Sequence, residues 1–97
     1  GGNAVPTVTI QPSTRFLKVD LVLPKTSAAS FRVRLLDEKT GSEVWSQSGL
    51  KPVAGEPRLL FEMPTQGIKS GPYTLVVGSG SNKGSQVKYP FDANLVQ

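Results

Sequence analysis

The segment GSGSNKGS, from Gly78 to Ser85, has the residue types that come closest to a phosphate-binding loop. A P-loop needs Gly, four residues and then Gly-Lys-Ser/Thr, whereas five residues separate Gly78 from Gly84 and Lys83 precedes Gly84. A dinucleotide fingerprint would need a further glycine at position 83 and a helix after it, whose first N–H groups bind the phosphates. We therefore interpret this segment as a hairpin connection between two strands.

Catalytic side chains are equally hard to assemble. The chain has no Cys and no His, which excludes thiolate catalysis, cysteine zinc sites and the usual general base. A general acid and base need two carboxylates in one site that separates their pKa values, and the sequence brings no such pair together among Asp37, Glu38, Glu56 and Glu62. The acidic residues also lack the alternating spacing of a Ca²⁺-binding loop. The lysines lie mostly beside acids or in loops, so no base for a serine nucleophile is evident. We predict a protein that is not an enzyme and that has no cofactor and no metal.

The charge pattern argues against nucleic acid. The chain of 97 residues carries 11 Lys and Arg against 7 Asp and Glu, a net charge of +4, but the basic residues are spread out and no aromatic platform interleaves with them. The apolar runs are only a few residues long, so neither a signal peptide nor a membrane span is expected within the segment. We expect one domain over residues 1–97, cut from a larger protein, with residues 1–4 as a cloning boundary or a flexible end.

Hydrophobic residues recur with a period of two along most of the chain, which is the pattern of half-buried β-strands. The strong segments bring odd-numbered apolar residues to one face, for example Leu17, Val19 and Leu21, or Leu59, Phe61 and Met63. We predict strong strands in 15–24, 30–38, 57–64, 72–78 and 86–95, and weaker strands in 7–11 and 43–47.

Two local features refine this prediction. Pro90 lacks the N–H that a sheet ladder needs, so the last strand is expected to lie at a sheet edge, at least locally. The segment PTQGIKSG, residues 64–71, is where one short helical turn could form. Apart from that turn, the sequence predicts an all-β protein.

Seven short strands with turn signals about every ten residues indicate an antiparallel two-sheet sandwich of the immunoglobulin or fibronectin type III kind, with a small closed barrel as the alternative. Tyr73 supports the sandwich, because it begins the penultimate strand just after Ile68, as in a tyrosine corner. In that motif the ring packs inward and the hydroxyl bonds to the upstream backbone. We therefore expect Tyr73 to be structural.

The turn DEKTGSEVW leaves the position of Trp45 open. A four-residue loop over 38–41 would place Val44 opposite Leu35 and Trp45 outside, opposite Arg34. A three-residue loop with a bulge would place Trp45 opposite Leu35 and in the core, where a sandwich more often keeps its only Trp. The exposed alternative predicts a partner-binding patch on one sheet, formed by Arg32, Arg34, Leu36, Trp45 and Val76.

Several segments together resemble a known family. The series VTIQPSTRFLKVDLVLP, ASFRVRLLDEKTGSEVW, LLFEMP, SGPYTLVV and YPF is similar to the extracytoplasmic sandwich domain of acidobacterial zinc-finger anti-sigma-factor-like proteins. Such proteins have a cytoplasmic zinc-binding segment, a single membrane span and then this domain. The resemblance implies an extracytoplasmic module, periplasmic or in the cell envelope, whose parent chain is anchored in the membrane outside this segment. It carries over no site residues, because the zinc ligands are absent.

These observations lead to one leading hypothesis and one alternative. The leading hypothesis is a non-catalytic module that binds a protein partner, senses or acts as a spacer within a membrane-anchored regulator, through an outer sheet face or an exposed edge strand. The alternative is a carbohydrate-binding accessory module that presents the rings of Trp45 and Tyr89 to a sugar. An enzyme would need a concave pocket with two converging polar groups.

Overall fold

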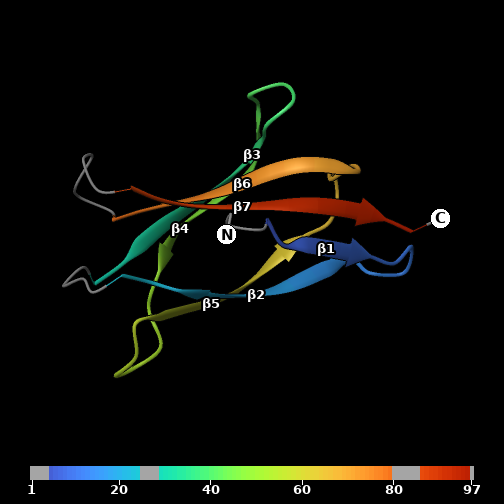
Figure 1. The fold of residues 1–97 in the computed structure, drawn as a ribbon. Helices are drawn as coiled ribbons and strands as arrows, with labels where there is room; N and C mark the ends of the chain where they lie inside the picture. Colours follow the sequence, from blue (N-terminus) through green and yellow to red (C-terminus); the bar gives the residue numbers. More distant parts are fainter. Residues whose placement is uncertain (1–4, 25–28, 80–85, 97) are drawn as a thin grey trace.

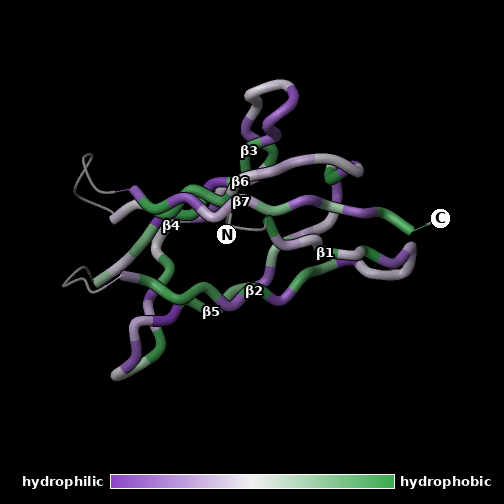
Figure 2. Tube along the Cα trace, in the orientation of Figure 1, coloured by the Kyte–Doolittle hydropathy of each residue, from purple (hydrophilic) through white to green (hydrophobic). Residues whose placement is uncertain are grey.

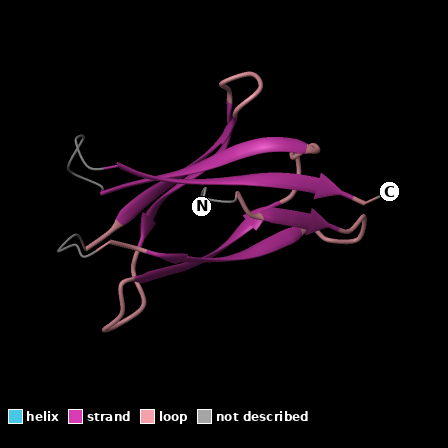
Figure 3. Cartoon of the chain, viewed as in Figure 1, coloured by secondary structure: helices cyan, strands magenta, loops and turns pink. Residues whose placement is uncertain are grey.

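The computed structural model describes residues 5–24, 29–79 and 86–96, and these residues form seven strands and no helix (Figure 3). The strands are β1 (Thr7–Ile10), β2 (Phe16–Val22), β3 (Phe31–Asp37), β4 (Glu43–Leu50), β5 (Arg58–Pro64), β6 (Gly71–Ser79) and β7 (Gln86–Leu95). The all-β prediction is confirmed, and β4 is longer than predicted.

The strands form two layers that face each other across the core (Figure 1). One sheet has five strands in the order β1-β7-β6-β3-β4, and the other consists of β2 and β5 alone. Within the described ranges no strand pairing joins the two sheets, so the closed barrel is wrong and two sheets are the correct arrangement. All neighbours are antiparallel except β1 and β7, which run parallel with Val8 opposite Ala93.

The core forms where the apolar faces of the two sheets meet, as the period-two pattern requires. Leu35 and Val33 of β3 and Leu59 of β5 are fully buried, and the hydropathy colouring shows apolar positions alternating with polar ones along the strands (Figure 2). The inward residues predicted for β2, β3 and β5 all belong to this core or pack against it, and so do Tyr89, Phe91, Ala93 and Leu95 of β7.

The middle strand of the larger sheet, β6, departs from simple alternation. Its inward residues Tyr73, Leu75 and Val77 are buried as predicted, but the outward Thr74 and Val76 are buried as well. The side chains of β3 and β7 flank these two positions, because Val76 lies opposite Arg34 on one side and Lys88 on the other. A central strand is therefore covered on its outer face by its neighbours.

Tyr73 forms the predicted corner. It is 2% exposed, and its hydroxyl accepts a hydrogen bond of 2.8 Å from the backbone N–H of Lys69. The ring stacks on Phe91 of the adjacent strand, with the ring centres 5.7 Å apart. The upstream segment 64–71 contains no helical turn; instead the Ile68 N–H donates to the Thr65 carbonyl in a tight turn that includes Gly67 at φ 86°.

Pro90 sits where its missing N–H costs no ladder hydrogen bond. The N–H groups of Asp92 and Val96 donate to the carbonyls of Pro6 and Ile10, so the even-numbered residues of β7 turn their N–H groups away from β6. β1 pairs only with residues 92–95 of β7. Around Pro90, β7 is thus a sheet edge, whereas its last residues are covered by β1.

Candidate interaction site at the β2 edge

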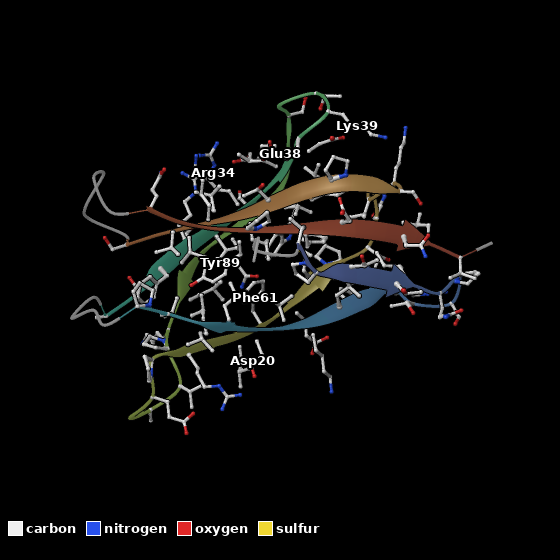
Figure 4. The ribbon with its side chains drawn as sticks, in the orientation of Figure 1. Asp20, Arg34, Glu38, Lys39, Phe61 and Tyr89 are labelled. Carbon is white, nitrogen blue, oxygen red and sulfur yellow. The ribbon has the colours of Figure 1, made fainter. Side chains whose placement is uncertain are left out.

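The predicted patch residues fall on opposite faces of the larger sheet. Arg32, Arg34 and Leu36 alternate along the outer face of β3, and Val76 lies directly opposite Arg34 on β6. The Arg34 Nε donates to Glu43 Oε1 at 2.7 Å, and Arg32 lies 4.0 Å from the same oxygen. Figure 4 shows Arg34 on this outer side. Val76 is only 3% exposed, so this surface is mainly an arginine–glutamate cluster.

Trp45 does not belong to that surface, which corrects the exposed alternative. It pairs with Leu35, and a register shift in β4 then places Glu43 opposite Leu36. This bulge turns Trp45 toward the opposite sheet, where its half-buried ring stacks on Phe61 with ring centres 5.9 Å apart. The hairpin turn that sets this register is closed by hydrogen bonds between Asp37 and Ser42 and between Gly41 and Asp37, with Gly41 at φ 74°.

The remaining residues considered for chemistry are partly outside the described ranges and partly engaged in ion pairs. The loop residues 80–85, including Lys83, lie outside the described residues, so the interpretation of that segment as a connection stays a prediction. The acids Asp20 and Glu56 both bind Arg58, and among the described residues no group of three or more potential ligands could hold a metal ion. No helix that could cross a membrane occurs in the described ranges.

The outer edge of β2 is a row of outward-facing backbone groups. Hydrogen bonds from Leu23 N–H to the Pro57 carbonyl and from Thr65 N–H to the Arg15 carbonyl flank the β2–β5 ladder. Because an antiparallel ladder alternates, the odd residues of β2 bond to β5 and the even residues turn their N–H and C=O groups away. These are Phe16, Lys18, Asp20 and Val22, and on the side of β2 that faces away from β5 no described strand pairs with them. We call this row the β2 edge.

An apolar groove runs beside the β2 edge. It has a volume of about 590 Å³ and lies between β2 and the part of β7 that β1 leaves uncovered. Leu17, Val19 and Leu21 form its wall on the β2 side. The opposite side is lined by Tyr89, Pro90 and Phe91, together with Val5, Pro6 and Val8 before and within β1. The mouth of the groove is therefore bordered by two strand edges.

Charged groups stand at the rim of this groove. Lys18, Asp20 and Lys88 line it at its polar margin. Asp20 points away from the larger sheet (Figure 4) and receives a two-pronged contact from Arg58, with Nε to Oδ1 at 3.1 Å. The hydrogen bond from Arg58 lowers the pKa of Asp20 below its usual value. Lys18 has no ion pair among the residues that the structure describes, although it lies opposite Glu62.

Tyr89 ties the two sheets together across the groove. Its hydroxyl donates a hydrogen bond of 2.7 Å to the carbonyl of Val22, one of the outward-facing groups of the β2 edge. Partial burial disfavours the phenolate and raises the pKa of Tyr89 above its ordinary value of 10.0. The neutral, donating form is thus the one that the folded protein prefers.

This preference predicts a pH dependence that Tyr89→Phe removes. Because folding raises the pKa of Tyr89, the protonated phenol contributes to the free energy of unfolding. This contribution is fully present below pH 10 and is lost as the pH rises through the pKa of the folded state. The difference between the phenolate absorbance titrations of the wild type and Tyr89→Phe isolates this group, and we expect its midpoint above 10. At neutral pH the variant should lose about 1 kcal/mol of stability. A midpoint at or below the ordinary value would contradict the packing of this ring.

Comparisons with protein-family models, curated proteins and solved structures find no match to this chain. The candidate site therefore stands on its geometry: a row of backbone groups without a partner strand, an apolar groove beside it and charges at the rim. Sequence reasoning missed this combination, because alternation shows which face of a strand is buried but not which strand lacks a neighbour. The mixed pattern of β2, with Lys18 and Asp20 between exposed Phe16 and Val22, was the signal available.

Proposed function

We propose that this chain is a non-catalytic protein-interaction module that binds an extended segment of a partner by strand addition along the β2 edge. The observation that carries the proposal is the set of outward-facing backbone groups of Lys18 and Asp20 beside an apolar groove. Strand-adding domains recognise peptides in this way: main-chain hydrogen bonds supply affinity, and pockets for alternate side chains supply specificity.

The wider setting is part of the same proposal. Seven strands in two layers and the corner bond of Tyr73 support an immunoglobulin-like identity for the sandwich. The resemblance in sequence supports an envelope-facing position in a membrane-anchored regulator, where such a module would sense, connect or space protein partners.

The carbohydrate alternative gains no support from the aromatic rings on which it depended. Trp45 is engaged with Phe61 between the sheets, and the Tyr89 hydroxyl is bonded to the Val22 carbonyl. Sugar binding of the expected kind needs coplanar rings presented outward, whereas both of these rings pack against the core.

An array of synthetic peptides with alternating apolar and polar residues, each as long as β2, tests strand addition. Binding peptides should slow hydrogen exchange at the amides of Lys18 and Asp20. The amide of Val19 faces β5 and should be protected already in the isolated protein. Failure of every peptide to bind, or binding that leaves those two amides unchanged, would contradict the proposal.

A proline substitution gives a matched pair of variants. Lys18→Pro removes a donor from the β2 edge without removing a hydrogen bond to β5, because the Lys18 N–H faces outward. Lys18→Gln removes the same charge but keeps the N–H. We expect Lys18→Pro to weaken peptide binding at least tenfold more than Lys18→Gln, as measured by titration calorimetry. Equal effects would show that the charge, and not strand pairing, is responsible.

A further inference from the structure

We infer that the strand added to the β2 edge is β2 of a second copy of this chain, antiparallel, with Lys18 of each copy opposite Asp20 of the other. This inference rests on the proposed function and names its partner. The product is a continuous four-stranded sheet in the order β5-β2-β2-β5, because each two-stranded sheet contributes the edge formed by β2.

The direction of the backbone groups restricts the possible registers. Only the even residues of β2 turn their N–H and C=O groups outward. Two such edges can bond only if even residues lie opposite even residues, so the numbers of each facing pair must sum to an even value. Registers with an odd sum would place outward groups against groups already bonded to β5.

Among the registers that overlap most of β2, the charges then select one. A sum of 36 places Lys18 opposite Lys18, and a sum of 40 places Asp20 opposite Asp20, so both set like charges against each other. A sum of 38 places Lys18 opposite Asp20 twice, once on each side of the two-fold axis. Asp20 keeps its contact with Arg58 on its own chain and still has acceptor positions for the second cation.

The same register matches apolar side chains on both faces. On the outer face it brings Phe16 opposite Val22 of the second copy, and these side chains are 58% and 68% exposed in the single chain. An aromatic residue facing a β-branched one is a favourable cross-strand pair. On the inner face Val19 meets Val19 and Leu17 meets Leu21, so the apolar wall of the groove continues into the second copy.

The arrangement also closes on itself. The two-fold axis passes beside Val19 of both copies, and each copy uses the same edge, so the assembly stops at a dimer. Pairing occupies the N–H and C=O groups that an open strand edge would otherwise offer to uncontrolled aggregation.

Two charge-reversal variants test the register. Lys18→Asp and Asp20→Lys each set like charges across the axis, so each alone should dimerise roughly tenfold more weakly than the wild type in sedimentation equilibrium. Mixing the two variants restores opposite charges at both positions, and the heterodimer should recover an affinity close to that of the wild type. Recovery on mixing would also show that both variants are folded.

The unaltered protein provides an independent measurement. The amides of Lys18 and Asp20 should become protected from exchange as the protein concentration rises, whereas protection of the Val19 amide should not change. A chain that stays monomeric to about 1 mM, or a dimer that neither variant weakens, would overturn this inference. Peptide binding with edge protection in a monomeric chain would leave the proposed function intact, whereas absence of both would remove the two together.

Discussion

Leu59→Ala should lower the free energy of unfolding by about 2–5 kcal/mol, while Leu60→Ala should change it by about 0.5 kcal/mol or less. The two residues are neighbours on β5 and lose the same atoms. Leu59 is 0% exposed in the core, and Leu60 is 51% exposed on the outer face. The first substitution leaves a cavity between the sheets, and the second removes a side chain that mostly contacts water.

Urea unfolding followed by circular dichroism measures both values. Domains of this size are stable by only about 5–15 kcal/mol, so the loss at Leu59 is a large share of the total. Similar losses for the two variants would indicate that β5 pairs with β2 one residue out of the register found here, since such a shift exchanges the faces of the strand.

Tyr73→Phe should have the next largest effect, about 1–3 kcal/mol of stability. The ring remains and can still stack on Phe91, but the N–H of Lys69 loses its acceptor in a half-buried position. A donor that is left unsatisfied costs more than the net value of an ordinary hydrogen bond.

The other tyrosine is the matched control for this substitution. Tyr89→Phe also deletes one hydroxyl, but the acceptor it leaves is the Val22 carbonyl beside the groove, where water can replace the phenol. We expect Tyr73→Phe to be the more destabilising of the two in thermal unfolding and to speed hydrogen exchange at Lys69. An unchanged exchange rate at that amide would mean that the corner bond does not hold the segment.

Periodicity in the sequence predicted the strands and their inward faces because burial of one face is a local property of the strand. The inward set of β3, Phe31, Val33 and Leu35, could be named in this way. Trp45 could not be placed, because its face depends on a bulge that one extra residue creates in β4. The length of the loop determines the register of the two strands, and the sequence of this turn is compatible with more than one loop length.

The sequence predicted that an exposed edge strand could be the interaction site, but it did not predict that this strand is β2. An edge strand with outward backbone groups was expected, and Pro90 located one stretch of edge in β7. That β2 has a partner on one side only follows from the way the five other strands assemble into the larger sheet. Sheet order is decided by long-range packing, which a period-two pattern does not encode.

The contact between Trp45 and Phe61 makes tryptophan fluorescence a probe of the packing between the two sheets. Trp45 is the single tryptophan of the chain and belongs to the larger sheet, while the ring beneath it belongs to the smaller one. Its emission colour and its accessibility to quenchers therefore report whether the two layers stay in register or slide apart. A ligand or a second copy that displaces the smaller sheet would therefore change the fluorescence of Trp45, and no added label is needed to measure it.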